Sequence, residues 1–456
     1  MTASPFKAYD IRGRIGETLD EDLAHALGRA LAATLDPGHV VLGRDIRASS
    51  EALEAALAAG LVAGGVAVTT IGLCGTEEVY FATDHLDAGA GVMVTASHNP
   101  IDYNGMKIVG PGAAPLPDAT FRALEAATLT GDARAAAGAP GRITAQDTRA
   151  AYVDHVTGLV DARALPPIKI VANAGNGCAG PTFDAVLTAL EAKGARLSVT
   201  QLHHDPDGTF PNGIPNPLLP ENQPVTAQAV RQVGADLGLA WDGDFDRCFF
   251  FDETGAFVPG EYMVGVIAEA VLAQDPGARI VHDPRVIWNT EDVVARAGGT
   301  AVPARTGHAL VKAAMRASGA AYGGEMSAHH YFRDFMFCDS GMVPWLMVLA
   351  AMGQGGRTLG QMVAERRAAF PSSGEINFRV PDPGALMAEI EAEETPDARG
   401  IDRLDGLSMD MGAWRFNLRR SNTEPLLRLN VETRGDAALL AAQVARLTGR
   451  IRAGCP

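Results

Sequence analysis

Short apolar runs alternate with amphipathic segments along most of the chain. Residues 23–31 place leucine and alanine at helical spacing, and Asp20 stands before them as the expected helix N-cap. Residues 40–45 follow as a short apolar run with a polar end, and the same pairing returns at residues 167–171 and 279–281. Strands that alternate with helices need crossover connections, which place them in parallel or mixed sheets. The pattern predicts three similar α/β/α units.

The pattern changes after the stretch at residues 370–374. Strand-like segments at residues 375–380 and 414–418 replace the alternation, and residues 437–451 carry one apolar face at helical spacing. We therefore expect a smaller α+β domain at the C-terminal end.

Two irregular stretches interrupt the regular pattern. Residues 133–141 are rich in Gly, Ala and Pro, which is typical of a linker and puts the first boundary near residue 145. The expected domains are residues 1–145, 146–253, 254–368 and 369–456. Residues 203–222 are dense in Pro, Gly, Asn and Asp and are too long for an ordinary turn; such loops are often functional.

The composition indicates a soluble folded protein with a large core. Of 456 residues, 47% are hydrophobic and 20% are charged, and the mean hydropathy is +0.05. A chain of this length exceeds one core. Its five cysteines are scattered without CxxC spacing, so neither a disulfide framework nor a thiolate zinc site is indicated.

The charge and the N-terminal residues exclude several partners. The formal net charge of -16 repels phosphate backbones, so we expect no nucleic-acid partner. The first residues lack the basic and apolar regions of a signal peptide, and no apolar run approaches the ~20 residues that cross a bilayer. We expect a cytoplasmic protein with no membrane partner, and we infer no obligate protein partner.

The first candidate for chemistry is the serine loop, residues 95–100. It follows the apolar run at residues 90–94, so Ser97 stands just beyond a buried strand and next to His98. A hydroxyl beside an imidazole in a turn is a candidate nucleophile. The alternative is an ordinary turn with a capping hydroxyl. A serine hydrolase is disfavoured, since Thr95 and Asn99 stand where a GxSxG elbow has glycine.

The second candidate is the aspartate loop, residues 242–247, which contains Asp242, Asp244 and Asp246. Three carboxylates at alternate positions can converge on one hard cation if Gly243 permits a tight turn. The other ligand positions of an EF-hand are missing. Three protein oxygens leave room for water or a substrate phosphate, which favours Mg²⁺ over a closed calcium cage. A solvated acidic loop is the alternative.

The third candidate is the stretch at residues 323–330, preceded by residues 306–308. Glu325 and Ser327 offer an acceptor and a donor-acceptor two positions apart, which suits neighbouring sugar hydroxyls. Adjacent histidines such as His329 and His330 are poorly placed to chelate one metal. Packing or surface exposure is the alternative for both.

The fourth candidate runs from Arg419 to Arg428. Guanidinium groups flank hydroxyl, amide and backbone donors, and this combination can grip a phosphate by charge and fork geometry. A plain basic turn is the alternative. No GxxxxGK[ST] loop occurs, so ATP binding of that kind is not supported.

Together the four loops resemble those of the α-D-phosphohexomutases. The motifs TASHNP, DGDFDR and GEMS and the arginine-flanked run are similar to the family's phosphoserine, metal, sugar and phosphate loops, in family order. The runs VHDPR at 281–285 and SAHHYFRD at 327–334 resemble the bacterial phosphomannomutases that feed GDP-mannose synthesis. The resemblance spans nearly the whole chain and implies three similar α/β/α domains with mixed sheets and a smaller α+β domain around a central cleft.

The resemblance also implies a phosphoryl-transfer mechanism. Ser97 would carry a phosphoryl group, and Mg²⁺ would be bound by the three aspartates and by a phosphate oxygen on Ser97. The sugar would accept this group to give a hexose 1,6-bisphosphate, the intermediate and activator, which turns over and returns its other phosphate. The expected activity is reversible interconversion of mannose 6-phosphate and mannose 1-phosphate.

The other family positions fall on charged and polar residues. Lys107 matches the position of a general base, and we expect neighbouring cations to depress its pKa. Arg12, His98 and Arg247 complete the predicted reacting centre. The predicted phosphosugar contacts are Tyr9, Arg285, Thr306, Gly307, His308, Glu325, Ser327, His329, Arg419, Ser421, Asn422, Thr423 and Arg428.

Other activities of the same loops remain open. A phosphoglucomutase or a dual-specificity hexose mutase is the first alternative, because mannose and glucose differ at one hydroxyl and the loop must accept two orientations. A phosphatase would release inorganic phosphate instead of an isomeric sugar phosphate. A non-catalytic sugar-phosphate-binding protein would have no need of Ser97 and Lys107.

Overall fold

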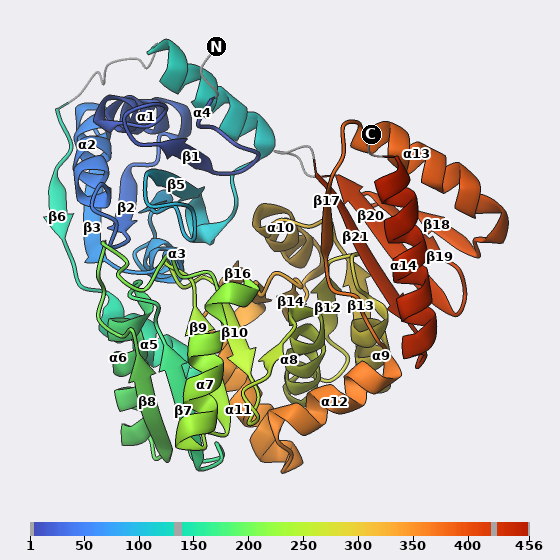
Figure 1. Ribbon diagram of the computed structural model, residues 1–456. Helices are drawn as coiled ribbons and strands as arrows, with labels where there is room; N and C mark the ends of the chain where they lie inside the picture. The colour runs from blue at the N-terminus through green and yellow to red at the C-terminus, as the bar shows by residue number, and fades with distance from the viewer. Residues whose placement is uncertain (1–3, 132–138, 421–425, 455–456) are drawn as a thin grey trace. The chain divides into compact units, whose positions relative to one another are not determined.

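The computed structural model describes residues 4–131, 139–420 and 426–454 (Figure 1). The chain forms two compact units: unit 1 comprises Met1–Phe257 and His329–Gln354, and unit 2 comprises Val258–Ala328 and Gly355–Pro456. Among the described residues, no helix combines the length and the apolar character that a membrane span requires.

A six-stranded mixed sheet carries the serine loop in unit 1. Its strand order is β1-β5-β4-β2-β3-β6 (Figure 1). Strand β2 runs parallel to β3 and β4, whereas β5 runs antiparallel to β4 and β1. The strands are β1 (Ile11–Arg14), β2 (His39–Arg44), β3 (Ala67–Leu73), β4 (Ala90–Val94), β5 (Tyr103–Val109) and β6 (Ile143–Ala145). The helices are α1 (Glu21–Leu35), α2 (Ser50–Ala63), α3 (Thr76–His85) and α4 (Asp118–Thr130).

Helix α1 begins where the sequence predicts. The Asp20 side chain accepts a hydrogen bond from Leu23 N (2.8 Å), so the predicted N-cap is confirmed. Leu27 and Leu31, one turn apart, are buried in the first core. Gly28 lets α1 approach α2, because a Cβ there would lie 2.3 Å from a backbone carbonyl oxygen of α2.

A second mixed sheet of unit 1 holds the aspartate loop between two antiparallel strands, β9 and β10. Its strand order is β11-β10-β9-β7-β8. The strands are β7 (Ile168–Asn173), β8 (Leu197–Leu202), β9 (Leu237–Trp241), β10 (Cys248–Phe251) and β11 (Phe257–Val258), and the helices are α5 (Arg149–Gly158), α6 (Ala179–Ala192) and α7 (Pro224–Val233).

The later segment of unit 1 adds the hairpin of β15 (His330–Phe332) and β16 (Cys338–Asp339) and the buried helix α11 (Val343–Gly355). Two buried side chains hold this segment. Trp241 Nε1 donates to Gly341 O (2.9 Å), and Glu77 accepts from the N–H groups of Gly341 and Met342.

Unit 2 contains a parallel arrangement and an antiparallel sheet. Strand β12 (Arg279–His282) is parallel to β13 (Thr300–Pro303) and β14 (Tyr322–Gly324). Their helices are α8 (Gly260–Gln274), α9 (Trp288–Arg296), α10 (His308–Ser318) and α12 (Leu359–Ala369). The antiparallel sheet has the order β17-β21-β20-β19-β18. Its elements are β17 (Ile376–Arg379), β18 (Gly400–Asp402), β19 (Leu407–Asp410), β20 (Trp414–Arg420), β21 (Leu426–Thr433), α13 (Pro383–Glu394) and α14 (Ala437–Ala453).

The C-terminal elements form a core of their own. Leu447 and Ile451 of α14 pack with Ile390 of α13 and with the apolar face of the antiparallel sheet. The predicted class, α/β domains with mixed sheets followed by a smaller α+β domain, is confirmed.

Candidate active site

The serine loop starts directly after β4 and holds Ser97 in a left-handed conformation. Its φ is 51°, which is uncommon outside glycine and is found at strained functional loops. Ser97 N donates to Thr95 Oγ1 (2.8 Å), and Thr95 Oγ1 donates to Asp45 Oδ2 (2.7 Å). The Arg47 guanidinium donates to Ser97 O (3.0 Å) and to three further backbone carbonyls of this segment. These contacts fix the loop against the end of β2.

The Ser97 hydroxyl lies between a carboxylate and an imidazole. Ser97 Oγ donates to Asp242 Oδ2 (2.7 Å) and lies 2.9 Å from His98 Nδ1. Burial, followed by the charge of the Arg247 guanidinium that contacts Nδ1, lowers the pKa of His98 to about 4. His98 is therefore neutral at pH 7, and its Nδ1 accepts hydrogen bonds. A histidine in this state is a poor triad base.

The aspartate loop brings its three carboxylates together. Asp242, Asp244 and Asp246 are all buried, and each offers one oxygen within 4.8 Å of the others. Asp242 Oδ2 accepts from Arg247 Nε (3.0 Å) and Nη2 (2.8 Å). Although burial opposes ionisation, Arg247 holds the pKa of Asp242 below its usual value. Arg247 thus balances part of the charge of the loop.

Two oxygens of this loop fit a cation. Asp244 Oδ1 and Asp246 Oδ1 are buried and have no hydrogen-bond partner among the described residues. Burial, together with the charge of Asp244, raises the pKa of Asp246 to about 6. Buried carboxylate oxygens without partners are costly, and hard divalent cations prefer oxygen ligands of this kind. The donor set therefore suits Mg²⁺ with open positions for further oxygens.

Lys107 lies among carboxylates, and the predicted depression of its pKa is wrong for this structure. Its Nζ donates to Asp244 Oδ2 (2.6 Å) and also contacts Asp246 Oδ2. Burial alone would lower the pKa of Lys107, but the two carboxylates outweigh burial and raise it. The resemblance indicated other cations near Lys107, but nothing in the sequence indicated that the Lys107 side chain contacts the aspartate loop.

The N-terminal residues reach the serine loop through the sheet. Strand β1 pairs with β5, which sets Arg12 opposite Gly105, two residues before Lys107. Arg12 Nη1 donates to Asn99 Oδ1 (2.5 Å) of the serine loop. Tyr9 lies half-buried in the bend before β1. Arg12 on β1 thus contacts the serine loop, whereas Lys107 on the neighbouring strand β5 contacts the aspartate loop.

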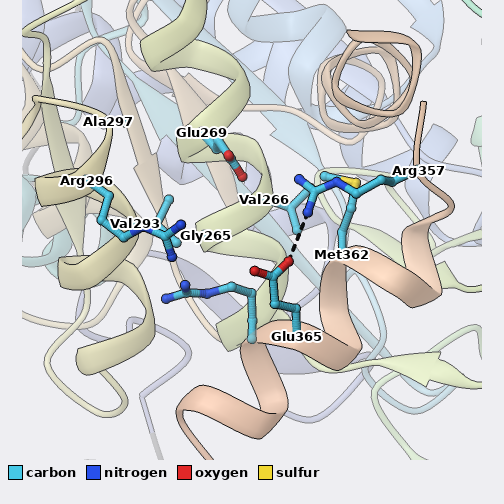
Figure 2. A pocket seen from close by; sticks show the side chains of 10 residues that line it. Gly265, Val266, Glu269, Val293, Arg296, Ala297, Arg357, Met362 and Glu365 are labelled. Carbon is cyan, nitrogen blue, oxygen red and sulfur yellow. Dashed lines mark hydrogen bonds and ion pairs between the residues drawn. The ribbon is translucent and has the colours of Figure 1, made fainter. Parts of the chain in front are cut away.

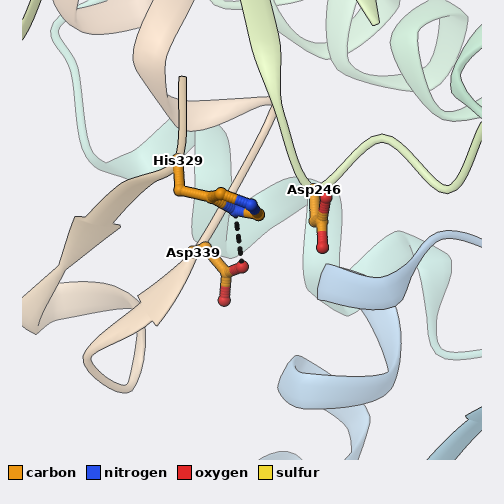
Figure 3. Close-up of side chains that lie close together, drawn as sticks. All are labelled: Asp246, His329 and Asp339. Carbon is orange, nitrogen blue, oxygen red and sulfur yellow. Dashed lines mark hydrogen bonds and ion pairs between the residues drawn. The ribbon is translucent and has the colours of Figure 1, made fainter. Parts of the chain in front are cut away.

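His329 belongs to unit 1, with the aspartate loop (Figure 3). Its Nδ1 lies 3.1 Å from Asp339 Oδ2, and ligand atoms of Asp246, His329 and Asp339 lie within 4.8 Å of one another. Burial would lower the pKa of His329, but the charges of Asp246 and Asp339 outweigh burial and raise it. The two carboxylates therefore favour the protonated form of the imidazole beside the aspartate loop.

The predicted sugar-binding residues gather in unit 2 at the ends of β13 and β14. Glu325, 1% exposed, accepts from Gly307 N (2.9 Å). Gly307 has a φ of 127°, which only glycine adopts readily, and it caps helix α10 at His308. Thr306 Oγ1 is buried without a hydrogen-bond partner among the described residues, and Ser327 is half-buried.

An arginine cluster, consisting of Arg285, Arg419 and Arg428, forms the second site of unit 2. Arg419 and Arg428 stand opposite each other on β20 and β21. Glu375 lies between Arg428 Nη1 (3.5 Å) and Arg285 Nη1 (3.4 Å). Burial, followed by the positive charge of Arg285, lowers the pKa of Arg419. Grouped guanidiniums with buried N–H donors are suited to a phosphate.

The Arg285 side chain is held by a carboxylate just after the end of β12. Its guanidinium makes a two-point contact with Asp283, from Nη2 to Oδ2 (2.8 Å) and from Nε to Oδ1 (3.1 Å). Asp283 Oδ2 also accepts from Met326 N (2.8 Å), the residue after Glu325. This carboxylate therefore joins the sugar-binding residues to the arginine cluster. Ser421, Asn422 and Thr423, predicted phosphate contacts, lie outside the described residues.

Sequence reasoning missed several residues that support these sites. Arg47 follows the polar end of β2. Strand β2 runs parallel to β4, which carries the serine loop, so both strands end at the same edge of the sheet. The polar residues at the end of β2 were therefore the one signal that could have indicated Arg47. Thr76 Oγ1 donates to Asp244 Oδ2 (2.6 Å), and Asp405 Oδ2 accepts from Thr306 N (3.1 Å). Thr76, Asp405 and Glu375 carried no local signal in the sequence.

A cavity of about 190 Å³ lies between α8, α9 and α12 in unit 2 (Figure 2). The Arg357 guanidinium in it donates to Glu365 Oε2 (2.9 Å), and the Arg366 guanidinium donates to Asp292 Oδ2 (2.7 Å). None of the predicted substrate contacts lines this cavity. It is separate from the predicted phosphosugar site.

The sheets and their four loops coincide with segments that match known family models. Residues 3–135, 150–255 and 259–370 match the models for phosphoglucomutase/phosphomannomutase alpha/beta/alpha domains I, II and III, and residues 375–449 match the C-terminal domain. The chain belongs to the phosphoglucomutase/phosphomannomutase family. The predicted family is therefore confirmed.

Relatives within this family match the whole chain. A phosphomannomutase of Salmonella typhimurium is 55% identical over 447 residues, which is 97% of each chain. A protein of Xanthomonas campestris described as "Phosphohexose mutases" is 54% identical over 452 residues, 99% of this chain and 100% of the relative. The crystal structure of a phosphoglucomutase/phosphomannomutase family protein from Burkholderia thailandensis has a TM-score of 0.87 at 31% identity and covers 100% of this chain and 98% of that chain.

Proposed function

We propose that this protein is a phosphomannomutase that interconverts mannose 6-phosphate and mannose 1-phosphate through a phosphoserine. The observation that carries this proposal is the buried Ser97 hydroxyl 2.7 Å from Asp242 Oδ2 of the aspartate loop, where Asp244 and Asp246 each keep a buried oxygen that no donor of the described residues reaches. A hydroxyl in this position can carry a phosphoryl group whose charge a loop-bound cation neutralises.

The proposed reaction consists of two transfers that balance. A hydroxyl of the bound sugar phosphate attacks the phosphorus on Ser97, the bond from phosphorus to Ser97 Oγ breaks, and the proton of the sugar hydroxyl passes by way of Lys107 to Ser97 Oγ. The resulting hexose 1,6-bisphosphate turns over. Ser97 Oγ then attacks the other phosphorus, which regenerates the phosphoserine, returns a proton to the sugar oxygen and releases the isomeric sugar phosphate.

Asp242, Asp244 and Asp246 would hold Mg²⁺ with an oxygen of the phosphoryl group on Ser97. The ion supplies charge neutralisation on the transferred group. Arg247 and Arg12 stabilise the same charge, and His98 stays neutral beside it. Lys107 moves the proton of the sugar hydroxyl, a role that requires it to leave its carboxylate partners in the substrate complex.

The loops of unit 2 would hold the parts of the sugar phosphate that do not react. Glu325 and Ser327 bind ring hydroxyls, and the arginine cluster binds the other phosphate. Tyr9, Thr306, Gly307, His308 and His329, together with Ser421, Asn422 and Thr423, complete the proposed contacts. We also propose the domain limits 1–145, 146–253, 254–368 and 369–456.

A hexose mutase that also accepts glucose phosphates is the second candidate. The relative from Xanthomonas campestris, described as a phosphohexose mutase, favours this wider specificity. A phosphatase of the same loops would release inorganic phosphate.

The test is a mutase assay with mannose 1-phosphate, glucose 1-phosphate and glucosamine 1-phosphate, each with Mg²⁺ and a bisphosphate primer. Mannose 1-phosphate should give the highest kcat/KM, and Ser97→Ala should abolish turnover. Ser198→Ala, at an exposed serine of strand β8, is the matched control and should turn over like the wild type. Full turnover by Ser97→Ala with primer supplied, or release of inorganic phosphate in place of isomer, would refute the proposal.

A further inference from the structure

The irregular stretch at residues 203–222 borders an open cavity at the surface that the proposed reaction does not use. This cavity, of about 220 Å³, is lined by residues of the stretch and by the carboxyl ends of β7 and β9. Asn173 ends β7, Gly175 follows it, and Trp241 ends β9. None of the predicted catalytic or substrate residues lines it.

The place of this cavity in the sheet is one at which α/β folds bind ligands. Strand β7 lies between β8 and β9, and it runs parallel to both (Figure 1). The chain therefore leaves β7 toward β8 on one side and returns to β9 on the other. The carboxyl ends of β7 and β9 flank this reversal of strand order, and ligands of open α/β sheets bind in the crevice at such a point.

Amide side chains dominate the polar lining of the cavity. Asn212 Nδ2 donates to Asn176 Oδ1 (2.9 Å), and Asn222 Nδ2 donates to Asn216 O (3.0 Å), so both amide groups already donate within the stretch. Asn216 Oδ1 is buried and has no hydrogen-bond partner among the described residues. Glu221 adds a carboxylate. The lining thus offers acceptors to a ligand that brings its own hydroxyl donors.

The charge of the lining disfavours a phosphate, because it includes the Glu221 carboxylate and, as its one basic side chain, His203. Neither Lys nor Arg is among the residues that line the cavity, in contrast with the arginine cluster of unit 2. Ile214 and Val225 supply apolar surface, which suits the C–H face of a sugar ring. The volume is below that of typical drug-sized sites, which suits a ligand of one ring.

The wall of the cavity is fixed before any ligand binds. Gly175 has a φ of 60°, and a Cβ there would lie 2.4 Å from Pro215 Cβ, so only glycine permits this packing. Trp241 is held by its hydrogen bond to Gly341 O. A preformed site loses less entropy on binding than a mobile loop would.

We propose that this cavity binds an unphosphorylated monosaccharide, a neutral polyhydroxy ligand, at a site separate from that of the phosphosugar substrate. Asn216 Oδ1 and the Glu221 carboxylate accept hydrogen bonds from its hydroxyls. Ile214 and Val225 contact its ring.

The test is a ligand-observed NMR titration of the full chain with D-mannose and D-glucose. The wild type should bind at least one of them saturably. We expect a Kd of about 1–10 mM, because only a few polar groups would hold the ligand. Saturating mannose 6-phosphate, added with Mg²⁺, should leave this binding unchanged. Absence of saturable binding by either sugar, or its displacement by mannose 6-phosphate, would overturn the proposal.

Variants locate the binding. Asn216→Ala removes the unpaired acceptor and should weaken binding about tenfold. Ile214→Trp fills the cavity and should abolish binding, whereas Ile143→Trp, at a 52% exposed position on β6, should bind like the wild type. Asn216→Ala keeps the test valid if Ile214→Trp does not fold. Wild-type affinity in Asn216→Ala would overturn the proposal, and so would wild-type affinity in a folded Ile214→Trp.

Discussion

Gly243 lies where the aspartate loop meets the serine loop, and replacing it with alanine perturbs that contact. A Cβ at this position would lie 2.6 Å from the Ser97 carbonyl oxygen. Real Cβ atoms essentially never approach a heavy atom closer than 3.0 Å, so one loop must move by at least 0.4 Å. The contacted atom belongs to the backbone, which Arg47 also holds, so a change of side-chain rotamer cannot relieve the clash.

The size of the displacement sets the expected effect. A misplacement of about 1 Å at a reacting centre can cost about a hundredfold in rate, so about half of that distance predicts a loss of about tenfold in kcat. Overpacking of a buried site costs about 1–3 kcal/mol. Gly243→Ala should therefore turn over about tenfold more slowly and unfold at a lower urea concentration.

The assay pairs steady-state mutase kinetics with urea unfolding. Gly449→Ala is the matched control, because Gly449 lies within α14 and a Cβ there meets nothing within 4 Å. That variant should keep the wild-type kcat and gain up to about 1 kcal/mol in stability. A Gly243→Ala protein with wild-type kcat and wild-type stability would refute the contact between the two loops.

Three further predictions concern a proton, an ion pair and a metal. Burial raises the pKa of Glu77 to about 8, so the folded protein keeps a proton that the unfolded chain releases. The free energy of unfolding should fall by up to about 1.4 kcal/mol per pH unit between about pH 5 and 8, and equal slopes in the wild type and Glu77→Gln would contradict this assignment. Arg415→Met removes the guanidinium at 2.6 Å from Glu432, 1% exposed, leaves that carboxylate with the backbone N–H groups of Ile287 and Trp288, and should cost about 3 kcal/mol in urea unfolding; a loss below about 1 kcal/mol would argue against the buried pair. Chelation followed by dialysis should abolish mutase turnover without unfolding, and Mg²⁺ should restore it; undiminished turnover would exclude a metal at the aspartate loop.

Local signals in the sequence were sufficient to predict the N-cap of α1 and the strands that precede the serine and aspartate loops. Asp20 caps α1 because a short side chain can satisfy a free backbone N–H, and this requires only neighbouring residues. The apolar run before Ser97 and the run before Asp242 both became buried strands, so the positions of the two loops could be read directly.

Contacts between distant segments could not be predicted in the same way. The Lys107 side chain lies beside carboxylates 137 and 139 positions further along the chain, and no periodicity reports such a distance. Because of that contact, the pKa of Lys107 is raised, whereas the sequence analysis expected it to be lowered. Arg47 and Glu375 were missed for the same reason, because their roles depend on which strand ends meet in the folded sheets.

Peptide mapping after phosphoryl labelling tests whether Ser97 carries the phosphoryl group. The full chain would be incubated with Mg²⁺ and a hexose 1,6-bisphosphate that carries labelled phosphate, and then digested and analysed by mass spectrometry. We expect one labelled peptide, phosphorylated at Ser97, whose label passes to added mannose 6-phosphate and is missing in Ser97→Ala. A protein that isomerises mannose phosphates with no label on Ser97, or with label on another residue, would contradict it.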